Sequence, residues 1–145
     1  MTPIYQLASE AKEPIVKRLA ELLAQREEIL FACLHGSFEE SIDGFNDIDV
    51  AVLLEPSKIQ PETVFDYQME LGIFLERHVN YSIDLKVLNF AGIGFQYAAS
   101  GGRLLTADDP ENWFSFRERT WLTYLDFAPV ARQALLDLFS ATTPS

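Results

Sequence analysis

The sequence predicts an α/β (α+β) fold, a mixed sheet of three or more strands flanked by helices. Three observations indicate this fold: apolar runs of strand length, amphipathic stretches between and after them, and a single-domain length of 145 residues. Strands and helices alternate too irregularly for a doubly wound sheet. No repeat or linker divides the chain, so residues 1–145 should form one domain, with a helical part at 110–140 as a candidate partner-binding surface.

The helices are predicted from apolar residues that recur at helical spacing. The stretches are Ile4–Ala11, Pro14–Leu23, Pro61–His78, Asp109–Phe127 and a last one that begins at Pro129. Pro14 and Pro129 suit the first turn of a helix, so each predicts a helix start. Asp109 is a suitable capping residue for the helix after it. In that helix Phe114 and Phe116 cannot both share the face of the tryptophans, so an aromatic side chain left outside is a candidate partner contact.

The strands are predicted from compact apolar runs at Ile29–Leu34, Ile48–Leu54 and Tyr81–Leu88. The first run ends at His35-Gly36, which predicts a turn. The third alternates apolar and polar residues, so Asp84 should face away from its apolar neighbours. A charged residue in the middle of an apolar strand needs a partner.

The charge balance restricts the function classes. Eleven basic residues against 22 acidic ones give a net charge of −11. The basic residues are scattered, so extended nucleic-acid binding is not expected. An acidic surface suits a cationic small molecule, a metal ion or a basic protein partner, although solubility alone also explains it.

Location is predicted from what the sequence lacks. No apolar run approaches the roughly 18 residues of a membrane span, and Met1–Ile4 has no signal-peptide pattern. Cys33 is the one cysteine, so no intramolecular disulfide argues for export, and we expect a cytoplasmic protein. Cys33 and His35 share a strand face, but two ligands are too few for a structural zinc site, so a buried cysteine is expected.

Three aspartates carry the predicted chemistry. Asp47 and Asp49 lie two residues apart at the start of a strand and should project to the same side. Paired carboxylates are hard donors that suit Mg²⁺ or Mn²⁺. If Asp84 lies beside them in the sheet, the three carboxylates complete a site for two metal ions. Asp47 alone could instead cap a turn after Asn46.

A glycine and a serine precede these aspartates and suit phosphate binding. Gly36 at the end of a strand lets backbone N–H groups approach phosphate oxygens, and the Ser37 hydroxyl adds a donor. Gly-Ser alone occurs by chance in many proteins. Its position ten residues before an Asp-x-Asp strand start makes the combination specific.

This combination resembles the DNA polymerase β-type nucleotidyltransferase superfamily. The motifs that carry the resemblance are Gly36-Ser37, Asp47-Ile48-Asp49, Ile83-Asp84-Leu85, Gly101-Gly102-Arg103-Leu104-Leu105 and Tyr124-Leu125-Asp126. Within the superfamily, the chain is most similar to the minimal nucleotidyltransferase (MNT) antitoxins of HEPN–MNT toxin–antitoxin pairs, over residues 13 to 130. The catalytic motifs are specific, and those of the tail are suggestive.

The resemblance implies an activity and its residues. Asp47, Asp49 and Asp84 would be catalytic and would hold two Mg²⁺ ions. Gly36 and Ser37 would bind the phosphates of ATP. The acceptor would be a tyrosine hydroxyl of a cognate HEPN ribonuclease toxin, which makes the reaction protein AMPylation.

One segment departs from the family pattern. Family members often carry an arginine after Gly-Ser, whereas Phe38–Ser41 is acidic here. Loss of a cation near a triphosphate weakens nucleotide binding. Either Lys58, Lys86 or Arg103 compensates, or transfer is slow, or the chain is an antitoxin that acts by binding alone. An aminoglycoside-type nucleotidyltransferase is a further alternative, since an acidic cleft suits a cationic drug, but 145 residues leave little room for a drug-binding domain.

Overall fold

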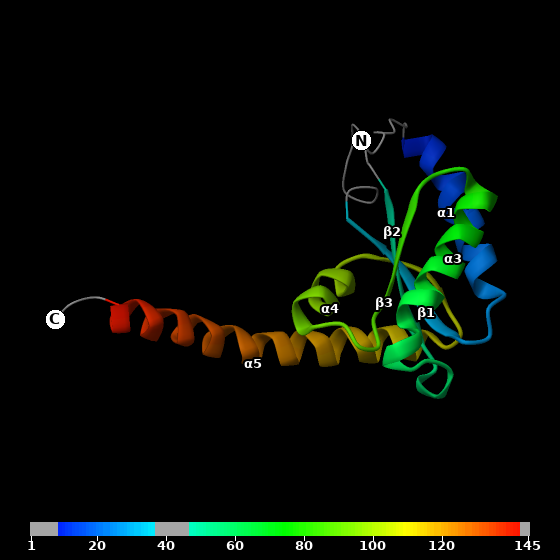
Figure 1. Ribbon diagram of the computed structural model, residues 1–145. Helices are drawn as coiled ribbons and strands as arrows, with labels where there is room; N and C mark the ends of the chain where they lie inside the picture. The colour runs from blue at the N-terminus through cyan, green and yellow to red at the C-terminus, as the bar shows by residue number, and fades with distance from the viewer. Residues whose placement is uncertain (1–8, 37–46, 143–145) are drawn as a thin grey trace.

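The computed structural model describes residues 9–36 and 47–142 (Figure 1). The elements follow the order α1 (Ser9–Ala24), β1 (Ile29–His35), β2 (Ile48–Leu54), η1 (Pro56–Lys58), η2 (Pro61–Thr63), α3 (Val64–Val79), β3 (Ile83–Val87), α4 (Ile93–Ser100), β4 (Arg103–Ala107) and α5 (Pro110–Thr142). The predicted α+β class is confirmed. The three predicted strands and the helix at 61–78 are also present.

The four strands form one mixed sheet in the order β3-β2-β1-β4. β1 runs antiparallel to β2 and β4, whereas β2 and β3 are parallel. A parallel pair needs a crossover connection, which α3 provides. Two elements were not predicted from the sequence, namely β4, a short and half-buried edge strand, and the eight-residue α4 before it.

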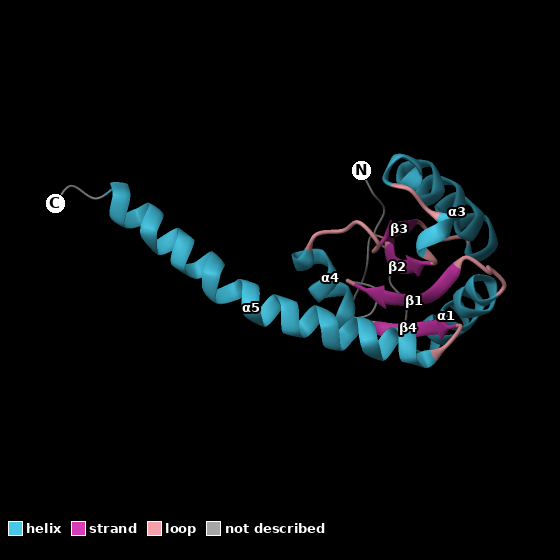
Figure 2. Ribbon diagram, turned by 90° about the horizontal axis from the view of Figure 1, so that it is seen from below, coloured by secondary structure: helices cyan, strands magenta, loops and turns pink. Residues whose placement is uncertain are grey.

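Helices cover both faces of the sheet (Figure 2). α1 and α3 pack on one face, over alternating apolar side chains of β1, β2 and β3. α4 and the first turns of α5 pack on the other, around Phe31, Cys33, Trp113 and Phe116. The ring of Phe31 lies 5.1 Å from that of Trp113, edge to face. Cys33 is fully buried as expected, and burial raises the pKa of its thiol to about 12.

Two predicted helix starts are wrong. α1 begins at Ser9 and continues through Pro14, and α5 runs through Pro129 as one helix of 33 residues. Both prolines are exposed, so water can reach the backbone carbonyls that they leave without a helical partner. Most of the predicted stretch Ile4–Ala11 lies outside the described residues. Among the helices that the structure describes, none combines the length and apolarity needed to cross a lipid bilayer.

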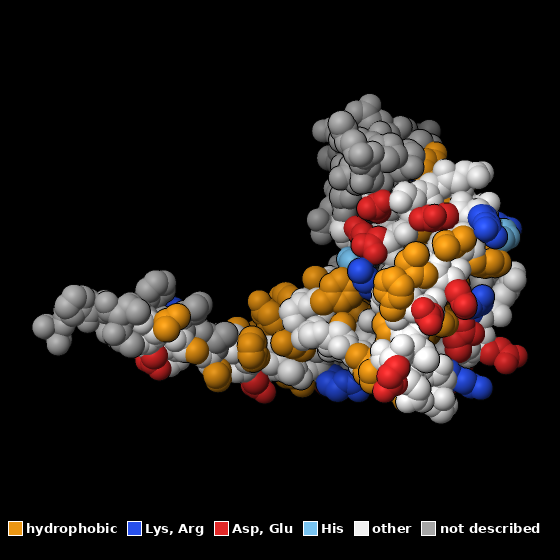
Figure 3. Space-filling view, viewed as in Figure 1, with side chains coloured by type: hydrophobic (Ala, Val, Ile, Leu, Met, Phe, Trp, Pro, Cys, Tyr) orange, Lys and Arg blue, Asp and Glu red, His pale blue; other side chains and the backbone are white. Residues whose placement is uncertain are grey.

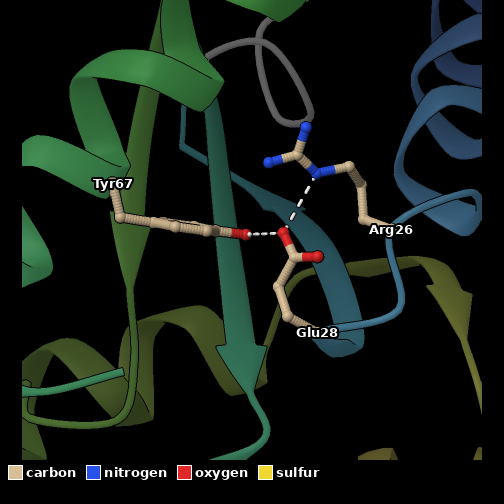
Figure 4. Close-up of polar contacts among 3 residues, drawn as sticks. All are labelled: Arg26, Glu28 and Tyr67. Atoms are coloured by element: carbon tan, nitrogen blue, oxygen red, sulfur yellow. Dashed lines mark hydrogen bonds and ion pairs between the residues drawn. The ribbon is translucent and has the colours of Figure 1, made fainter. Parts of the chain in front are cut away.

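A polar cluster fixes α3 against the start of β1 (Figure 4). The Glu28 carboxylate accepts hydrogen bonds from the Tyr67 hydroxyl at 2.8 Å and from Arg26 Nε at 3.0 Å. Burial alone would raise the pKa of Glu28, but these bonds and one from its own backbone outweigh it and leave the pKa below its usual value. Burial and the contact with Glu28 raise the pKa of Tyr67. This cluster helps to hold α3 beside the sheet.

The two halves of α5 have different surroundings. In the first half, Arg117 Nε donates to the Ser100 carbonyl at 3.0 Å, and Trp121 Nε1 donates to Ser100 Oγ at 2.8 Å. Tyr124 stacks on Tyr97 of α4 with ring centroids 3.9 Å apart. After Tyr124 the helix projects away from the domain (Figure 1). Its exposed large hydrophobic residues there are Leu125, Phe127, Val130, Leu136 and Leu138.

Candidate active site

Strand pairing brings the predicted aspartates to one face of the sheet. Asp49 of β2 and Asp84 of β3 occupy paired positions in the parallel ladder. Asp47 lies in the bend just before β2, where its carboxylate accepts a hydrogen bond from Ser82 and its charge acts on Asp49. Ile48 and Ile83 alternate with them and are buried on the opposite face, under α1 and α3. The predicted placement of Asp84 beside Asp49 is confirmed.

The three carboxylates affect one another electrostatically. Burial raises the pKa of Asp49 to about 6, and the charges of Asp84 and Asp47 add to this, while Lys86 opposes it. Lys86 Nζ lies 3.6 Å from Asp84 Oδ1, and both side chains are about half exposed. Among the described side chains, Lys86 is the cation that opposes the raised pKa of Asp49, and three carboxylates stand against it, so a further cation is favoured at this face.

Ser82 positions Asp47 and was missed by the sequence analysis. Its hydroxyl donates to Asp47 Oδ1 at 2.6 Å, and its carbonyl accepts from the backbone N–H of Ile48 at 2.9 Å. The sequence does contain a signal for this contact. Ser82 stands two residues before Asp84, as Asp47 stands two residues before Asp49, so a parallel register that pairs the second set also pairs the first.

Gly36 is required by two features of the turn after β1. Its φ of 78° lies in the left-handed region that side chains disfavour. A Cβ built on Gly36 would also collide with Asp49 Oδ2. The neighbouring His35 pairs with Asp49 in the antiparallel ladder. The turn backbone therefore lies directly against the Asp49 carboxylate. Ser37 lies outside the described residues, as does Phe38–Ser41, so their roles remain predictions.

The three basic residues that could compensate for the arginine missing after Gly36-Ser37 lie in different parts of the fold. Lys58 lies in η1, after the far end of β2, whereas Asp49 stands near the start of that strand. The order along β2 therefore gives no support to Lys58 as the compensating cation. Lys86 lies beside Asp84. Arg103 is paired with Leu34 near the Gly36 end of β1, where it forms two hydrogen bonds with Glu13 at 2.9 and 3.0 Å.

The donor set fits a divalent cation. Within residues 9–36 and 47–142, no three His, Cys, Asp or Glu side chains are close enough together to form a complete metal site. Asp47, Asp49 and Asp84 nevertheless share one face, and their oxygens are the donors that Mg²⁺ prefers. Their mutual repulsion, seen in the raised pKa of Asp49, would be relieved by a bound cation. The three side chains thus fit a divalent cation through the chemistry of their oxygen donors and through the face that they share.

The fold and this acidic face define a small α+β domain of the nucleotidyltransferase type. Residues 17–111 match the family model described as polymerase beta, nucleotidyltransferase, so the chain belongs to this family. The resemblance seen in the sequence is confirmed at this level. No curated protein matches the chain.

Several solved structures share the fold. One, from Shewanella oneidensis, is a tri-AMPylated HEPN toxin in complex with MNT antitoxin; the match has 21% identity and a TM-score of 0.67, and covers 89% of this chain and 98% of that chain. A second is the toxin–antitoxin MntA–HepT, with 20% identity, a TM-score of 0.67 and coverage of 88% and 98%. A third is a toxin–antitoxin with AMP-PNP, with 22% identity, a TM-score of 0.68 and coverage of 86% and 98%. At these identities the likeness shows a shared fold.

Proposed function

We propose that this protein is a metal-dependent nucleotidyltransferase that acts as an antitoxin, transferring AMP from ATP to a tyrosine hydroxyl of a HEPN toxin. The observation that carries the proposal is the pairing of Asp49 with Asp84, with the Gly36 turn against the Asp49 carboxylate. Membership of the nucleotidyltransferase family supports the chemistry. Complexes of similar fold that contain an AMPylated HEPN toxin or AMP-PNP support the acceptor and the donor.

Each residue of the site has a role in the proposed reaction. Asp47, Asp49 and Asp84 hold two Mg²⁺ ions, which when bound neutralise charge on the triphosphate. The Gly36 turn and the Ser37 hydroxyl bind the outer phosphates. Asp84 accepts the proton of the attacking tyrosine hydroxyl. A bond forms between the tyrosine oxygen and the α-phosphorus, and the bond from that phosphorus to pyrophosphate breaks.

The proposed toxin-binding surface is α5. Its exposed aromatic side chains include Phe114, Trp121 and Phe127, and aromatic residues are enriched at the centres of interfaces. The net charge of −11 would steer a basic partner toward the protein. Since ATP and a ribonuclease toxin meet in the cytoplasm, we place the reaction there.

A second candidate function is neutralisation by binding alone. The projecting half of α5 favours it, because a long exposed apolar helix suits a stable complex as well as a transient one. In this alternative the protein covers the active site of the toxin, and the aspartates are not needed.

Co-expression with a HEPN toxin separates the two functions. We expect the wild-type protein to restore growth and to add the mass of one or more AMP groups to the toxin. The double variant Asp47→Asn, Asp49→Asn should do neither. A control variant, Asp108→Asn with Glu55→Gln, removes two exposed carboxylates outside both α5 and the acidic face and should behave as wild type. Growth restored by the aspartate variant, with the toxin unmodified, would assign the function to binding.

A further inference from the structure

Helix α3 exposes an apolar stripe that the domain core does not explain. Phe65, Met69 and Ile73 recur every four residues and are 70%, 49% and 42% exposed. The core-facing side of the same helix already buries Leu71 and Leu75. An amphipathic surface helix normally places polar residues on its outer face, so three large apolar side chains in a row indicate a contact surface.

The stripe lines a groove that reaches the candidate active site. The α3–β3 groove is lined by Phe65, Met69, Ile73 and Glu76 of α3 and by Asp84 and Lys86 of β3. β3 lies at the edge of the sheet that the described strands form. Asp84 therefore belongs both to the groove and to the acidic face. In Figure 3 hydrophobic side chains lie over α3 and β3 with acidic side chains around them.

The charges of the groove select a basic occupant. Glu76 and Asp84 line the groove. The exposed Asp66 and Glu70 each stand one residue after a member of the stripe on α3. Its one lining cation, among the described residues, is Lys86, which pairs with Asp84 at 3.6 Å. A nucleic acid would meet repulsion here, whereas Lys or Arg side chains would be attracted.

The outer edge of β3 limits how an occupant can bind. The backbone N–H of Ile83 donates to Glu76 Oε1, and that of Val87 donates to Gln68 Oε1, both at 2.9 Å. Since side chains of α3 already satisfy these donors, a partner strand cannot use them to extend the sheet. These two bonds interrupt the row of outward-facing donors, so the groove offers an occupant mainly side-chain contacts, along a stripe about 12 Å long.

We propose that the α3–β3 groove binds the polypeptide segment that carries the acceptor hydroxyl. The segment is apolar next to the acceptor residue and carries Lys or Arg on either side. Apolar side chains cover the stripe, the basic residues meet the flanking carboxylates, and the hydroxyl is delivered to Asp84. This proposal rests on the proposed function, because it assigns the acceptor side of that same site.

The test uses two labelled peptides and three proteins. One peptide carries Tyr flanked by Leu and Arg, and the other carries Tyr flanked by Gly and Glu. The proteins are wild type, the groove variant Phe65→Ser, Met69→Ser, and the control variant Leu136→Ser, Leu138→Ser, which removes apolar side chains of similar exposure from α5. Thermal melts verify folding, and Asp66→Lys with Glu70→Lys is a second groove variant that leaves the stripe intact.

Binding without nucleotide is measured by fluorescence anisotropy. We expect the basic peptide to bind wild type at least tenfold more tightly than the acidic peptide. Both groove variants should lose at least tenfold in affinity for the basic peptide, and the control variant should not. Equal binding of the peptides to wild type, or unchanged binding to the groove variants, would overturn the proposal. The proposal would also be overturned if the groove substitutions changed only the oligomeric state, from homodimer to monomer, and left peptide binding as it was.

AMP transfer is then measured with Mg²⁺ and ATP, to separate the groove from the chemistry. We expect transfer to the basic peptide to fall at least tenfold in the groove variants, while the shift in melting temperature caused by Mg²⁺ and ATP is retained. Full transfer by the groove variants would overturn the groove proposal and leave the proposed function intact. Groove-dependent binding with no transfer by wild type would support the groove and count against the proposed function.

Discussion

The acidic face of the sheet and the projecting half of α5 both expose groups that a binding partner could cover, but the groups are of different kinds. On the sheet, backbone pairing aligns Asp49 with Asp84, the Gly36 turn lies against Asp49 and the Ser82 hydroxyl holds Asp47, so the three carboxylates leave negative charge that is only partly balanced. After Tyr124, α5 exposes apolar side chains, such as Leu125 and Val130, so the unsatisfied quantity is apolar area. The first region favours binding of a cation and its ligand, and the second favours contact with another protein surface.

The largest expected effect comes from a substitution on the acidic face that leaves α5 unchanged. Asp84→Asn removes the carboxylate that we propose as proton acceptor, so transfer of AMP should fall by about 10²–10⁴-fold. Capture of the toxin should be unchanged, because α5 is intact. Transfer is measured with labelled ATP, and capture by surface-immobilised toxin. Asp108→Asn, an exposed carboxylate between β4 and α5, is the matched control. A transfer rate within threefold of wild type would remove Asp84 from the mechanism.

The next largest effect tests whether the backbone of the Gly36 turn lies against the Asp49 carboxylate. Gly36→Ala places a methyl group against Asp49 Oδ2 and forces alanine to a φ of 78°. We expect a loss of about 1–3 kcal/mol in the free energy of unfolding, measured in urea. Gly94→Ala is the control, since nothing lies near the added Cβ there. Within α4 this change should be neutral or stabilising by up to about 1 kcal/mol. Equal effects at both glycines would contradict the close contact.

The two regions were not equally predictable from the sequence. Local alternation predicts that Asp47 and Asp49 share a side and that Asp84 faces away from its apolar neighbours, whereas the position of Asp84 beside Asp49 depends on strand pairing. The contact of Asp47 with Ser82 also depends on the register of that parallel pair, which local patterns do not fix. The continuous α5 could not be predicted, because a proline more often begins a helix than lies inside one. Pro129 is exposed, so water can bind the carbonyl that it leaves without a helical partner, but this fact about exposure is not visible in the local sequence.

A smaller effect tests α5 while leaving the acidic face intact. Leu125→Ser with Val130→Ser removes two side chains that are 64% and 65% exposed. Little stability should change, since neither is in the core, but affinity for the HEPN toxin should fall about tenfold. Toxin capture and urea unfolding are measured together. Retained affinity in a folded variant would move the toxin-binding surface away from the projecting half of α5.

The smallest effect measures the electrostatic strain of the acidic face directly. The pKa of Asp49 is raised from 3.8 to about 6 in the folded protein. The folded state therefore holds this proton more tightly than the unfolded state does, so the contribution of Asp49 to stability falls as pH rises from about 4 to about 6 and then stays low.

Asp49→Asn removes this contribution and should stabilise the metal-free protein above pH 6. We expect a gain of about 1 kcal/mol after allowance for solvent screening, or about 2–4 °C in melting temperature. Near pH 4 the gain should disappear, because the wild-type carboxyl is then protonated in the folded state. Calorimetry at pH 4 and pH 7.5 without divalent ions measures it, with Asp126→Asn as control. Adding Mg²⁺ at pH 7.5 should stabilise wild type more than the variant. A gain of the same size at both pH values would mean that shape, rather than charge repulsion, limits stability at this face.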